Sequence, residues 1–252
     1  MTEPEIRMSP DADSLAAAVA EALVERIVAA QAERGIAHVV LTGGGIGTAT
    51  LAAVPDAPGS AAVDWSAVEV WWGDERFVPS GDAERNESGA RTAFLDRLPL
   101  DPARVHPMPS TDDAPGPAAA AASYAADLAA AAAPGSPVPA FDVLMLGVGP
   151  EGHVASLFPG LPGVHEAAPV VAVLDSPKPP PTRISLSFPS LRAAREVWLI
   201  AAGEGKAAAM AAAASPGTSP FDVPAAGARG QDRTIFWLDA AAGARLGPIA
   251  EG

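Results

Sequence analysis

A histidine that follows a glycine-rich loop is the clearest catalytic candidate in this sequence. His153 ends the segment 147–153, which directly follows the apolar run 141–146. Open α/β sheets bind ligands at the carboxyl ends of their strands, and an imidazole can take up and return a proton near neutral pH. We therefore predict that His153 is a general acid/base.

The other three histidines suit structural positions. His38 falls within a predicted strand, His106 lies between a valine and a proline at a strand end, and His165 lies in a loop. None shows the H-E-x-x-H spacing or another metal-ligand spacing. The sequence has no cysteine, which excludes a disulfide, a zinc–thiolate site and a thiol nucleophile. No metal is expected.

The loop before His153 also fits the dinucleotide-binding pattern G-x-G-x-x-G over residues 147–152. Asp175 follows 23 residues after the last glycine of the loop, which is the distance expected for an acidic residue that binds a ribose. Against this, Pro150 removes a backbone donor from the loop, and the Pro-Gly pair 159–160 stops any following helix after about two turns. An NAD-binding protein therefore remains the less favoured alternative.

A second glycine-rich turn points to an anion. Thr42, Gly43, Gly44 and Gly45 follow the apolar run 36–41 and precede a helical segment. Bare backbone N–H groups can approach a phosphate closely there, and a helix N-terminus adds a favourable potential. A tight turn that needs positive φ is the alternative; three consecutive glycines favour phosphate binding. A P-loop is excluded because no Gly-Lys-Ser/Thr follows.

Charged residues follow a third predicted strand, 68–72. Asp74 and Glu75 could orient a histidine or bind sugar hydroxyls, and Arg76 could bind a phosphate or carboxylate through two hydrogen bonds. A solvated charged turn is an equally open interpretation of these three residues.

Two further basic residues also lie at predicted strand ends. Arg183 begins a strand after the proline-rich loop 175–182, and Lys206 lies at a predicted helix start. The chain has only 16 Lys and Arg against 30 Asp and Glu, so basic residues at such positions favour an anionic ligand.

The overall charge excludes several classes of partner. The net charge of −14 argues against binding to nucleic acid or to an anionic membrane surface. No apolar run approaches the roughly 20 residues that span a bilayer, and the acidic start leads into no signal-type hydrophobic segment. We expect a cytoplasmic protein.

The elements that must position these residues alternate between strands and helices. Ser9 is the predicted N-cap of a first helix that ends at Gly35, with apolar residues at four-residue spacing. The predicted strands are 36–41, 68–72, 141–146, 183–188, 197–201 and 234–238, and the other predicted helices are 48–53, 86–98, 118–133 and 206–214. Strands that are apolar throughout indicate a mostly parallel sheet with helices on both faces, here in one domain over 1–252.

Together these motifs resemble the 6-phosphogluconolactonase family of the glucosamine-6-phosphate isomerase/deaminase-like superfamily. The resemblance rests on 41–45, on 72–79 with Asn86 downstream, on 146–160, and on 183–186 with 205–206, in the family's order. It implies a three-layer α/β/α, Rossmann-like fold and hydrolysis of 6-phosphogluconolactone to 6-phosphogluconate without a cofactor.

The resemblance also carries roles over to individual residues. It implies a catalytic group of His153, Glu151 and Arg76. The resemblance carries over the phosphate-binding turn at Gly43–Gly45 and basic contacts at Arg183 and Lys206. With these, the substrate-binding residues that we predict are Thr42, Gly43, Gly44, Gly45, Asp74, Glu75, Asn86, Gly152, Arg183 and Lys206. The partner is then a small sugar-phosphate lactone. Separately, we expect a monomer, with a dimer as the alternative.

The sequence departs from the family pattern at two positions. Glu151 stands where the family usually has Asp before Gly-His, which changes the reach of the carboxylate. Gly45 stands where the first turn usually has Ser or Thr, so that Thr42 or Thr48 must supply any hydroxyl contact to phosphate.

Two alternatives use the same scaffold. A sugar-phosphate isomerase/deaminase typically continues Gly-His with an Asn-Glu-Pro type of segment, whereas 156–159 reads Ser-Leu-Phe-Pro here. A non-catalytic sensor would bind phosphogluconate without turning over the lactone. For a lactonase with a histidine base, activity should fall on acidification towards the ordinary histidine pKa of ~6.5.

Overall fold

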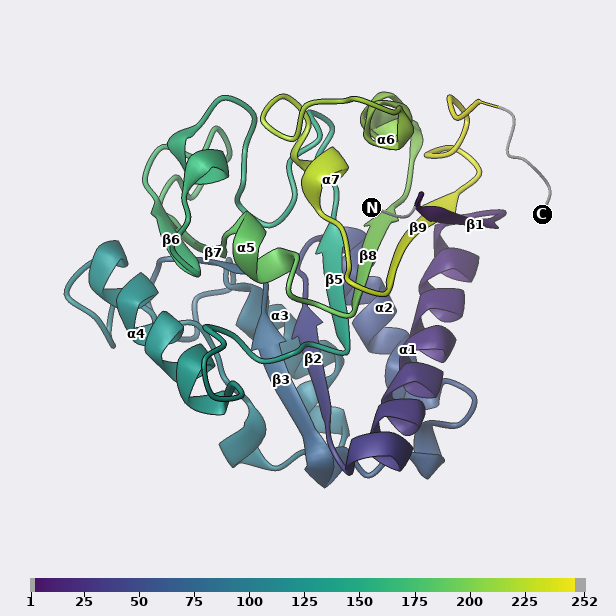
Figure 1. Cartoon of the computed structure of the whole chain (residues 1–252). Coiled ribbons are helices and arrows are strands. Elements are labelled where there is room, and N and C mark those ends of the chain that lie inside the picture. The colour runs from purple at the N-terminus through teal and green to yellow at the C-terminus, as the bar shows by residue number, and fades with distance from the viewer. Residues whose placement is uncertain (1–2, 248–252) are drawn as a thin grey trace.

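A parallel sheet forms the centre of the molecule. The computed structural model describes residues 3–247, and in this range six parallel strands pair in the order β1-β9-β8-β5-β2-β3. The strands are β1 (Glu5–Ser9), β2 (Ala37–Leu41), β3 (Val68–Trp72), β5 (Val143–Gly147), β8 (Glu196–Ala201) and β9 (Arg233–Asp239). In Figure 1 they run from β3 at the left to β1 at the right. The predicted mostly parallel sheet is confirmed.

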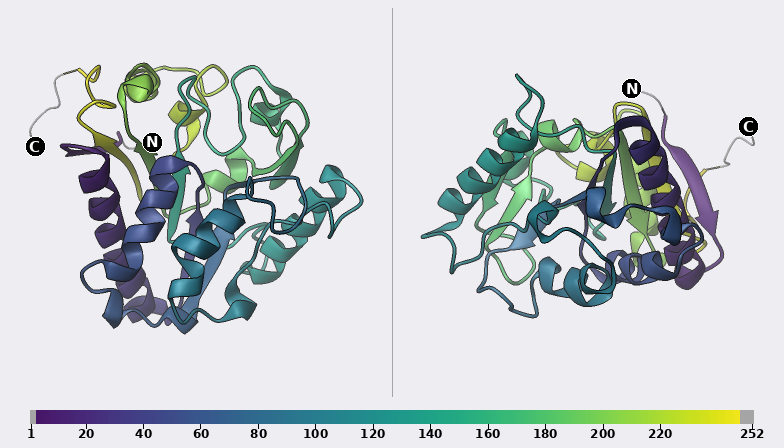
Figure 2. Two further views of the ribbon diagram at one scale, coloured as in Figure 1. Left: turned by 180° about the vertical axis from the view of Figure 1, so that it is seen from behind. Right: turned by 90° about the horizontal axis from the view of Figure 1, so that it is seen from below.

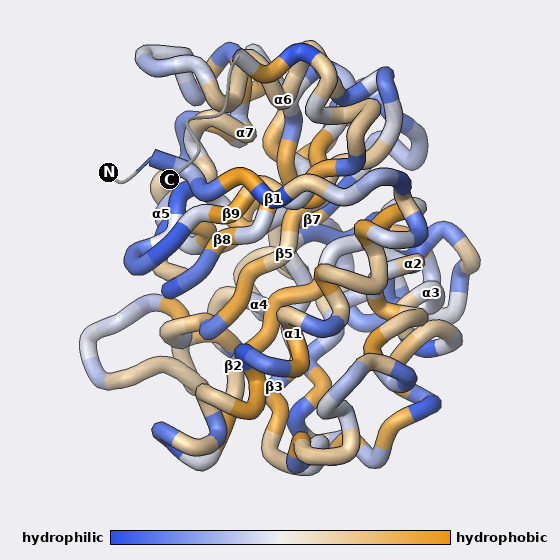
Figure 3. Tube along the Cα trace, turned by 90° about the vertical axis from the view of Figure 1, so that its right-hand side faces the viewer, coloured by the Kyte–Doolittle hydropathy of each residue, from blue (hydrophilic) through white to orange (hydrophobic). Residues whose placement is uncertain are grey.

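Helices cover both faces of this sheet. The helices are α1 (Ala12–Arg34), α2 (Gly45–Ala53), α3 (Asn86–Ala93), α4 (Pro117–Ala131), α5 (Phe188–Leu191), α6 (Ala207–Ala214) and α7 (Pro224–Gly227). Figures 1 and 2 show α1 and α2 on one face of the sheet and α4 on the other. The central strands are buried on both sides, which explains their largely apolar sequences. Figure 3 shows that the tube through β5, β2 and β3 is coloured mostly as hydrophobic residues.

The first helix begins later than the sequence predicts. Asp11, not Ser9, is the N-cap of α1, and its side chain accepts a hydrogen bond from the Ser14 backbone N–H at 2.8 Å. Ser9 instead ends β1, an edge strand. The sequence pattern did not predict this strand, because its residues are exposed or half-buried and form no apolar run. The predicted C-cap is confirmed, since Gly35 has φ of 75°.

A second, antiparallel sheet lies beside the main one, and the sequence did not predict it. It contains β4 (Asp74–Arg76), β7 (Arg183–Leu186) and β6 (Val170–Val173), in the order β4-β7-β6. The segment predicted as a charged turn is therefore β4, and the strand predicted over 183–188 belongs to this small sheet and not to the parallel one. The register pairs Arg76 with Arg183, which brings two distant charged segments together.

Several element ends also differ from prediction. α2 begins inside the glycine turn, at Gly45, and not at Thr48. The helix predicted over 86–98 ends at Ala93 and continues as a 3-10 turn, Leu95–Arg97. These shifts leave the arrangement of the strand ends unchanged.

Candidate active site

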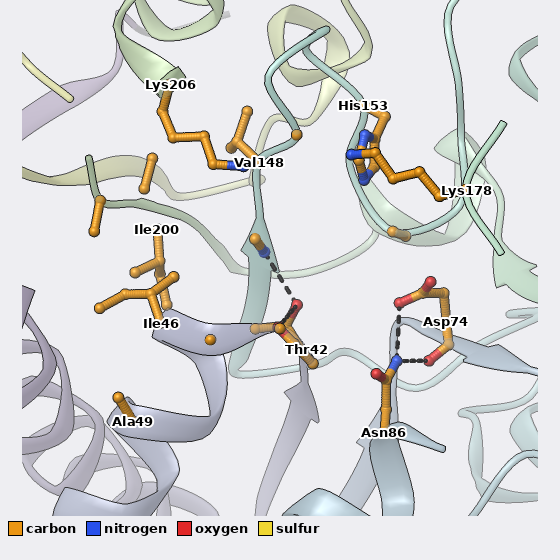
Figure 4. A pocket seen from close by; sticks show the side chains of 18 of the residues that line it. Thr42, Ile46, Ala49, Asp74, Asn86, Val148, His153, Lys178, Ile200 and Lys206 are labelled. Carbon is orange, nitrogen blue, oxygen red and sulfur yellow. Dashed lines mark hydrogen bonds between the residues drawn. The ribbon is translucent and has the colours of Figure 1, made fainter. Parts of the chain in front are cut away.

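A cavity of about 530 Å³ opens at the carboxyl ends of the parallel strands. Its walls come from the turns that follow β2 and β5, from the end of β8, from β4, and from the segment that leads into α6. Parallel strands that end at one edge bring these sequence-distant turns together, as expected for a ligand site in an open α/β sheet. Figure 4 shows the cavity from close by.

The first glycine turn forms one wall of the cavity. Gly44 has φ of 81° and precedes the first turn of α2, so the turn is itself the N-terminus of a nine-residue helix. Gly43 packs directly against the side chain of Asn86, and a Cβ at this position would overlap the amide. The turn therefore presents backbone and not side chains to the cavity, which is the chemistry of an anion site.

The hydroxyl groups near this turn are not placed as the sequence suggested. Thr42 Oγ1 accepts a hydrogen bond from the Gly147 backbone N–H at 3.0 Å, so it ties the two glycine-rich loops together. Thr48 is not among the residues that line the cavity. Thr42 therefore acts first as a bridge between the two glycine-rich loops.

Asp74 and Asn86 form a fixed polar pair on the cavity wall. Asn86 Nδ2 donates to the backbone carbonyl of Asp74 at 2.8 Å and to its Oδ1 at 3.4 Å. Ser156 Oγ donates to Asp74 Oδ2 at 2.6 Å. The side chains of Asp74 and Asn86 line the cavity (Figure 4). Their fixed orientation suits recognition of hydroxyl groups.

Glu75 does not reach the cavity, contrary to the substrate-binding role expected for it. Successive side chains of a strand point to opposite faces, so Asp74 and Arg76 line the cavity while Glu75 points into the interior. Its carboxylate accepts backbone N–H bonds from Arg76, Asn86 and Glu87 at 2.7–2.9 Å. Burial raises the pKa of Glu75, while Arg85 and these donors lower it. Glu75 therefore caps α3 and supports the site from behind.

His153 lies against the second glycine loop, with Glu151 beside it. Glu151 Oε1 is 3.0 Å from His153 Nδ1. Within the residues that the structure describes, this buried nitrogen has no hydrogen bond of good geometry, so the contact is best described as electrostatic. The imidazole packs directly on Gly149, where a Cβ would overlap the ring, and on Phe158, with ring centroids 4.4 Å apart.

Burial and three charged neighbours determine the pKa of His153. Burial lowers the pKa of His153 below its ordinary value; Glu151 and Asp74 raise it, and Lys178 lowers it. Partial burial raises the pKa of Glu151, but its own backbone N–H, His153 and Lys178 lower it overall. The pair therefore consists of a neutral imidazole beside an ionised carboxylate near neutral pH.

Gly152 has a conformational role in the structure, and the substrate contact expected of it stays a prediction. Its φ is 88°, and a Cβ would fall 2.7 Å from Val223 Cγ1. It is not among the residues that line the cavity. Its backbone carbonyl accepts a hydrogen bond from Ala225 N at 2.9 Å, so Gly152 shapes the turn that aims His153.

The three predicted basic residues all line the cavity but are engaged differently. Arg76 donates through Nη1 to the carbonyl of Glu84. Arg183 donates to the carbonyls of Lys178, Pro179 and Pro180 at 3.1–3.3 Å, which holds the proline-rich loop in place.

Lys206 is half-buried and lies across the cavity from His153 (Figure 4). Burial, and to a smaller extent Lys178, lowers its pKa. It lines the same cavity as the glycine turn, and its positive charge suits a phosphate.

Lys178 is a cavity residue that the sequence reasoning missed. It lies in the loop predicted over 175–182, and its Nζ is 3.2 Å from Glu151 Oε1 and 3.3 Å from Glu151 Oε2. The signal that could have found it is compositional: the whole chain contains only two lysines, Lys178 and Lys206, and both line this cavity.

The remaining sequence candidates lie away from the cavity. His106 Nε2 donates to Glu69 Oε2 at 2.6 Å. The His106 ring stacks on Trp71, whose indole N–H donates to His38. His165 stacks on Phe221.

The described part of the chain lacks the features that other classes of site require. Between the G-x-G-x-x-G loop and β6, the structure has a 3-10 turn, Pro162–His165, and no crossover helix of a dinucleotide-binding unit. Residues 3–247 contain no group of three or more His, Asp or Glu side chains placed to hold a metal ion. In the same range, no helix combines the length and apolar character of a membrane span.

Known proteins resemble this chain over nearly its whole length. A family model described as glucosamine-6-phosphate isomerases/6-phosphogluconolactonase matches residues 10–237. The chain is 54% identical over 248 residues to a 6-phosphogluconolactonase of Streptomyces coelicolor, which covers 96% of this chain and 95% of that protein. It is 50% identical over 244 residues to a 6-phosphogluconolactonase of Mycobacterium tuberculosis, which covers 96% and 98% respectively. The solved structure of a 6-phosphogluconolactonase from Trypanosoma brucei matches with a TM-score of 0.85 at 26% identity, over 98% of this chain and 100% of that one.

Proposed function

The chain belongs to the family of glucosamine-6-phosphate isomerases and 6-phosphogluconolactonases, and we propose that it is one of the lactonases of this family. It hydrolyses 6-phosphogluconolactone to 6-phosphogluconate, in the oxidative pentose phosphate pathway. The relatives at 50–54% identity over 96% of the chain support this activity. The observation in the structure that carries the proposal is an imidazole and an anion-binding turn on opposite walls of one cavity.

The phosphate of the substrate binds at the glycine turn. The backbone N–H groups at Gly44 and Gly45 begin α2, and the helix dipole adds a favourable potential for the anion. Lys206 supplies a positive charge on the same side of the cavity. This binding energy fixes the remote end of the sugar and orients the lactone carbonyl.

Hydrolysis takes place at the opposite wall, beside His153. Neutral His153 removes a proton from water, and the resulting hydroxide forms a bond to the lactone carbonyl carbon. When the carbon–ring oxygen bond breaks, protonated His153 gives the proton to that oxygen, which becomes a hydroxyl group. Because Glu151 faces Nδ1, Nε2 is the nitrogen that exchanges the proton.

The polar residues between the two ends hold the sugar and the developing charge. Arg76 lies on the cavity face of β4 and stabilises the oxyanion together with backbone N–H groups. Asp74 and Asn86, already fixed by each other, bind sugar hydroxyls. Contact between substrate and the Nη1 of Arg183 stays a prediction, since the other nitrogens of that side chain hold the proline-rich loop.

The reaction is proposed to take place in the cytoplasm, in a monomer. A chain without cysteine suits a reducing compartment. All of the groups named above come from one chain, so catalysis requires no second copy. The whole chain acts as one domain in this proposal.

Turnover of the lactone separates the proposed function from its alternatives. The lactone is generated in situ by oxidation of glucose 6-phosphate, and its disappearance is followed against a buffer blank. The wild-type chain should accelerate hydrolysis, and His153→Ala should lose ~10²–10⁴-fold. Phosphogluconate binding without turnover would indicate a sensor, and ammonia release from glucosamine 6-phosphate would indicate a deaminase. A His153→Ala variant with wild-type turnover would exclude the proposed base.

A further inference from the structure

The two lysines of this chain are both cavity residues. The chain has 16 basic residues, of which only Lys178 and Lys206 are lysines, and both line the cavity described above. Elsewhere the chain uses arginine wherever it needs a positive charge. Lysine differs from arginine in its compact ammonium group with three rotatable donors. Lys206 is accounted for by the phosphate, which leaves Lys178 without a role.

Lys178 is connected to the imidazole through one carboxylate. Its Nζ lies 3.2 Å and 3.3 Å from the two oxygens of Glu151, and Glu151 Oε1 lies 3.0 Å from His153 Nδ1. Figure 4 shows the Lys178 side chain extended toward the His153 ring. The carboxylate is therefore held between an ammonium group and an imidazole.

The backbone of Lys178 is fixed by its neighbours. Ser176 Oγ accepts from the Lys178 backbone N–H at 3.2 Å and donates to the Lys178 carbonyl at 3.0 Å. Arg183, which is buried, donates from Nη2 to the same carbonyl at 3.2 Å. A side chain on such an anchored loop loses less entropy when it holds a partner than one on a free loop.

We propose that Lys178 is a positioning residue for the lactone hydrolysis, which acts through Glu151 on His153. This inference rests on the proposed function. The ammonium group holds the carboxylate 3.0 Å from Nδ1, where its negative charge favours the tautomer with the hydrogen on Nδ1, so that Nε2 remains free to accept a proton from water.

The charge of Lys178 has a second effect at this position. A carboxylate alone at 3.0 Å would favour the imidazolium form, which cannot act as a base. The ammonium group offsets that field and keeps the ring neutral. The charged groups that face the ring are Glu151, Lys178 and Asp74, and Phe158 covers it on another side. Without Lys178, the two carboxylates remain and the ring holds its proton to higher pH.

An NMR titration tests this without any need for turnover. The chain has four histidines, so the imidazole Cε1–H signals of wild type, Lys178→Met and Lys178→Arg can be followed with pH, and His153→Gln assigns the relevant signal. In Lys178→Met the His153 midpoint should move to higher pH, and in Lys178→Arg it should stay near wild type. The other three histidines report whether the fold is intact. An unchanged His153 midpoint in Lys178→Met overturns the inference.

Kinetics provide the second arm of the test. In Lys178→Met, kcat/KM should fall more at pH 6 than at pH 8, with roughly a threefold to tenfold loss on the acid side, because the neutral fraction of the ring falls about tenfold for every pH unit below its midpoint. Lys178→Arg should restore the wild-type profile. In a Glu151→Gln background, Lys178→Met should change the pH profile less than in the wild-type background, because only the direct field of the ammonium group on the ring is then lost.

The outcomes distinguish the inference from the proposed function. A raised KM with an unchanged pH profile would mean that Lys178 contacts the substrate directly, and an undiminished effect in the Glu151→Gln background would mean that it does not act through Glu151. Either result overturns the inference. A wild-type chain that does not hydrolyse the lactone overturns the proposed function instead, while the NMR titration still tests the link between Lys178 and His153.

Discussion

Replacement of Gly149 by alanine should disable the site while leaving the fold in place. The imidazole of His153 lies directly on the Cα of Gly149. A Cβ at this position would overlap Nδ1 and Cε1 of the ring and would fall 2.8 Å from Glu151 Oε2. Both partners of the proposed catalytic pair would therefore have to move.

The size of the effect follows from the contact distances. Nonbonded carbon atoms pack at about 3.5–4.0 Å, so the ring must retreat by on the order of 1.5 Å. A misplacement of about 1 Å can cost ~10²-fold in rate. We expect kcat/KM of Gly149→Ala to fall ~10²-fold or more, up to the ~10⁴-fold loss of a removed base.

The backbone around Gly149 should tolerate the change. Gly149 does not adopt positive φ. Its backbone N–H donates to the His153 carbonyl, and its own carbonyl accepts from the Gly152 N–H, both at 2.9 Å. Alanine can form the same two backbone hydrogen bonds. The variant should therefore keep its circular dichroism spectrum and unfold cooperatively.

The assay is lactone disappearance corrected for spontaneous hydrolysis, with Gly89→Ala as the matched control. Gly89 lies within α3, and a Cβ there would meet only Thr48 Oγ1 at an ordinary 3.9 Å. The control should keep wild-type kcat/KM and gain slight stability. A folded Gly149→Ala variant with kcat/KM within about twofold of wild type would refute the placement of His153 as the base.

Two further predictions concern protonation and stability. Burial lowers the pKa of His153, and the proposed base must be neutral to act. The midpoint of the acid limb of kcat/KM should therefore lie below the ordinary value of ~6.5, and a midpoint above that value would contradict this environment. Glu75→Gln should lower the free energy of unfolding, measured in urea titrations, by about 2–4 kcal/mol. The glutamine amide cannot accept all three backbone N–H bonds that the carboxylate accepts, and it leaves the buried Arg85 without its charged partner at this position. Loss of less than about 0.5 kcal/mol would show that the buried carboxylate is not needed.

Much of the site could be predicted from local sequence. Apolar runs without alternation identified the buried parallel strands, and glycines directly after two of them identified the loops at the carboxyl edge of the sheet. Since parallel strands end at one edge, the turn at 43–45 and the loop before His153 had to meet. These features depend on patterns within about ten residues, which a single sequence displays.

The small antiparallel sheet was decided by tertiary structure. Whether Asp74 or Glu75 faces the cavity depends on the register of β4 against β7, and a shift of one residue would exchange them. The sequence shows both carboxylates side by side and does not distinguish them. β1 likewise exists only through its pairing with β9 at the other end of the chain.

The contact of Lys178 with Glu151 is the clearest case of this kind. The two residues lie 27 positions apart, on separate loops, and meet because Arg183 and Ser176 fix the loop of Lys178 over the cavity. Composition alone showed that lysine is rare here, but not where its ammonium group points. Periodicity in a sequence describes which face of a helix or strand is buried, whereas the contacts of an irregular loop depend on how distant segments pack. The sequence by itself therefore determined the parallel sheet and the edge of it that binds ligands. The tertiary structure decided which side chains surround the imidazole.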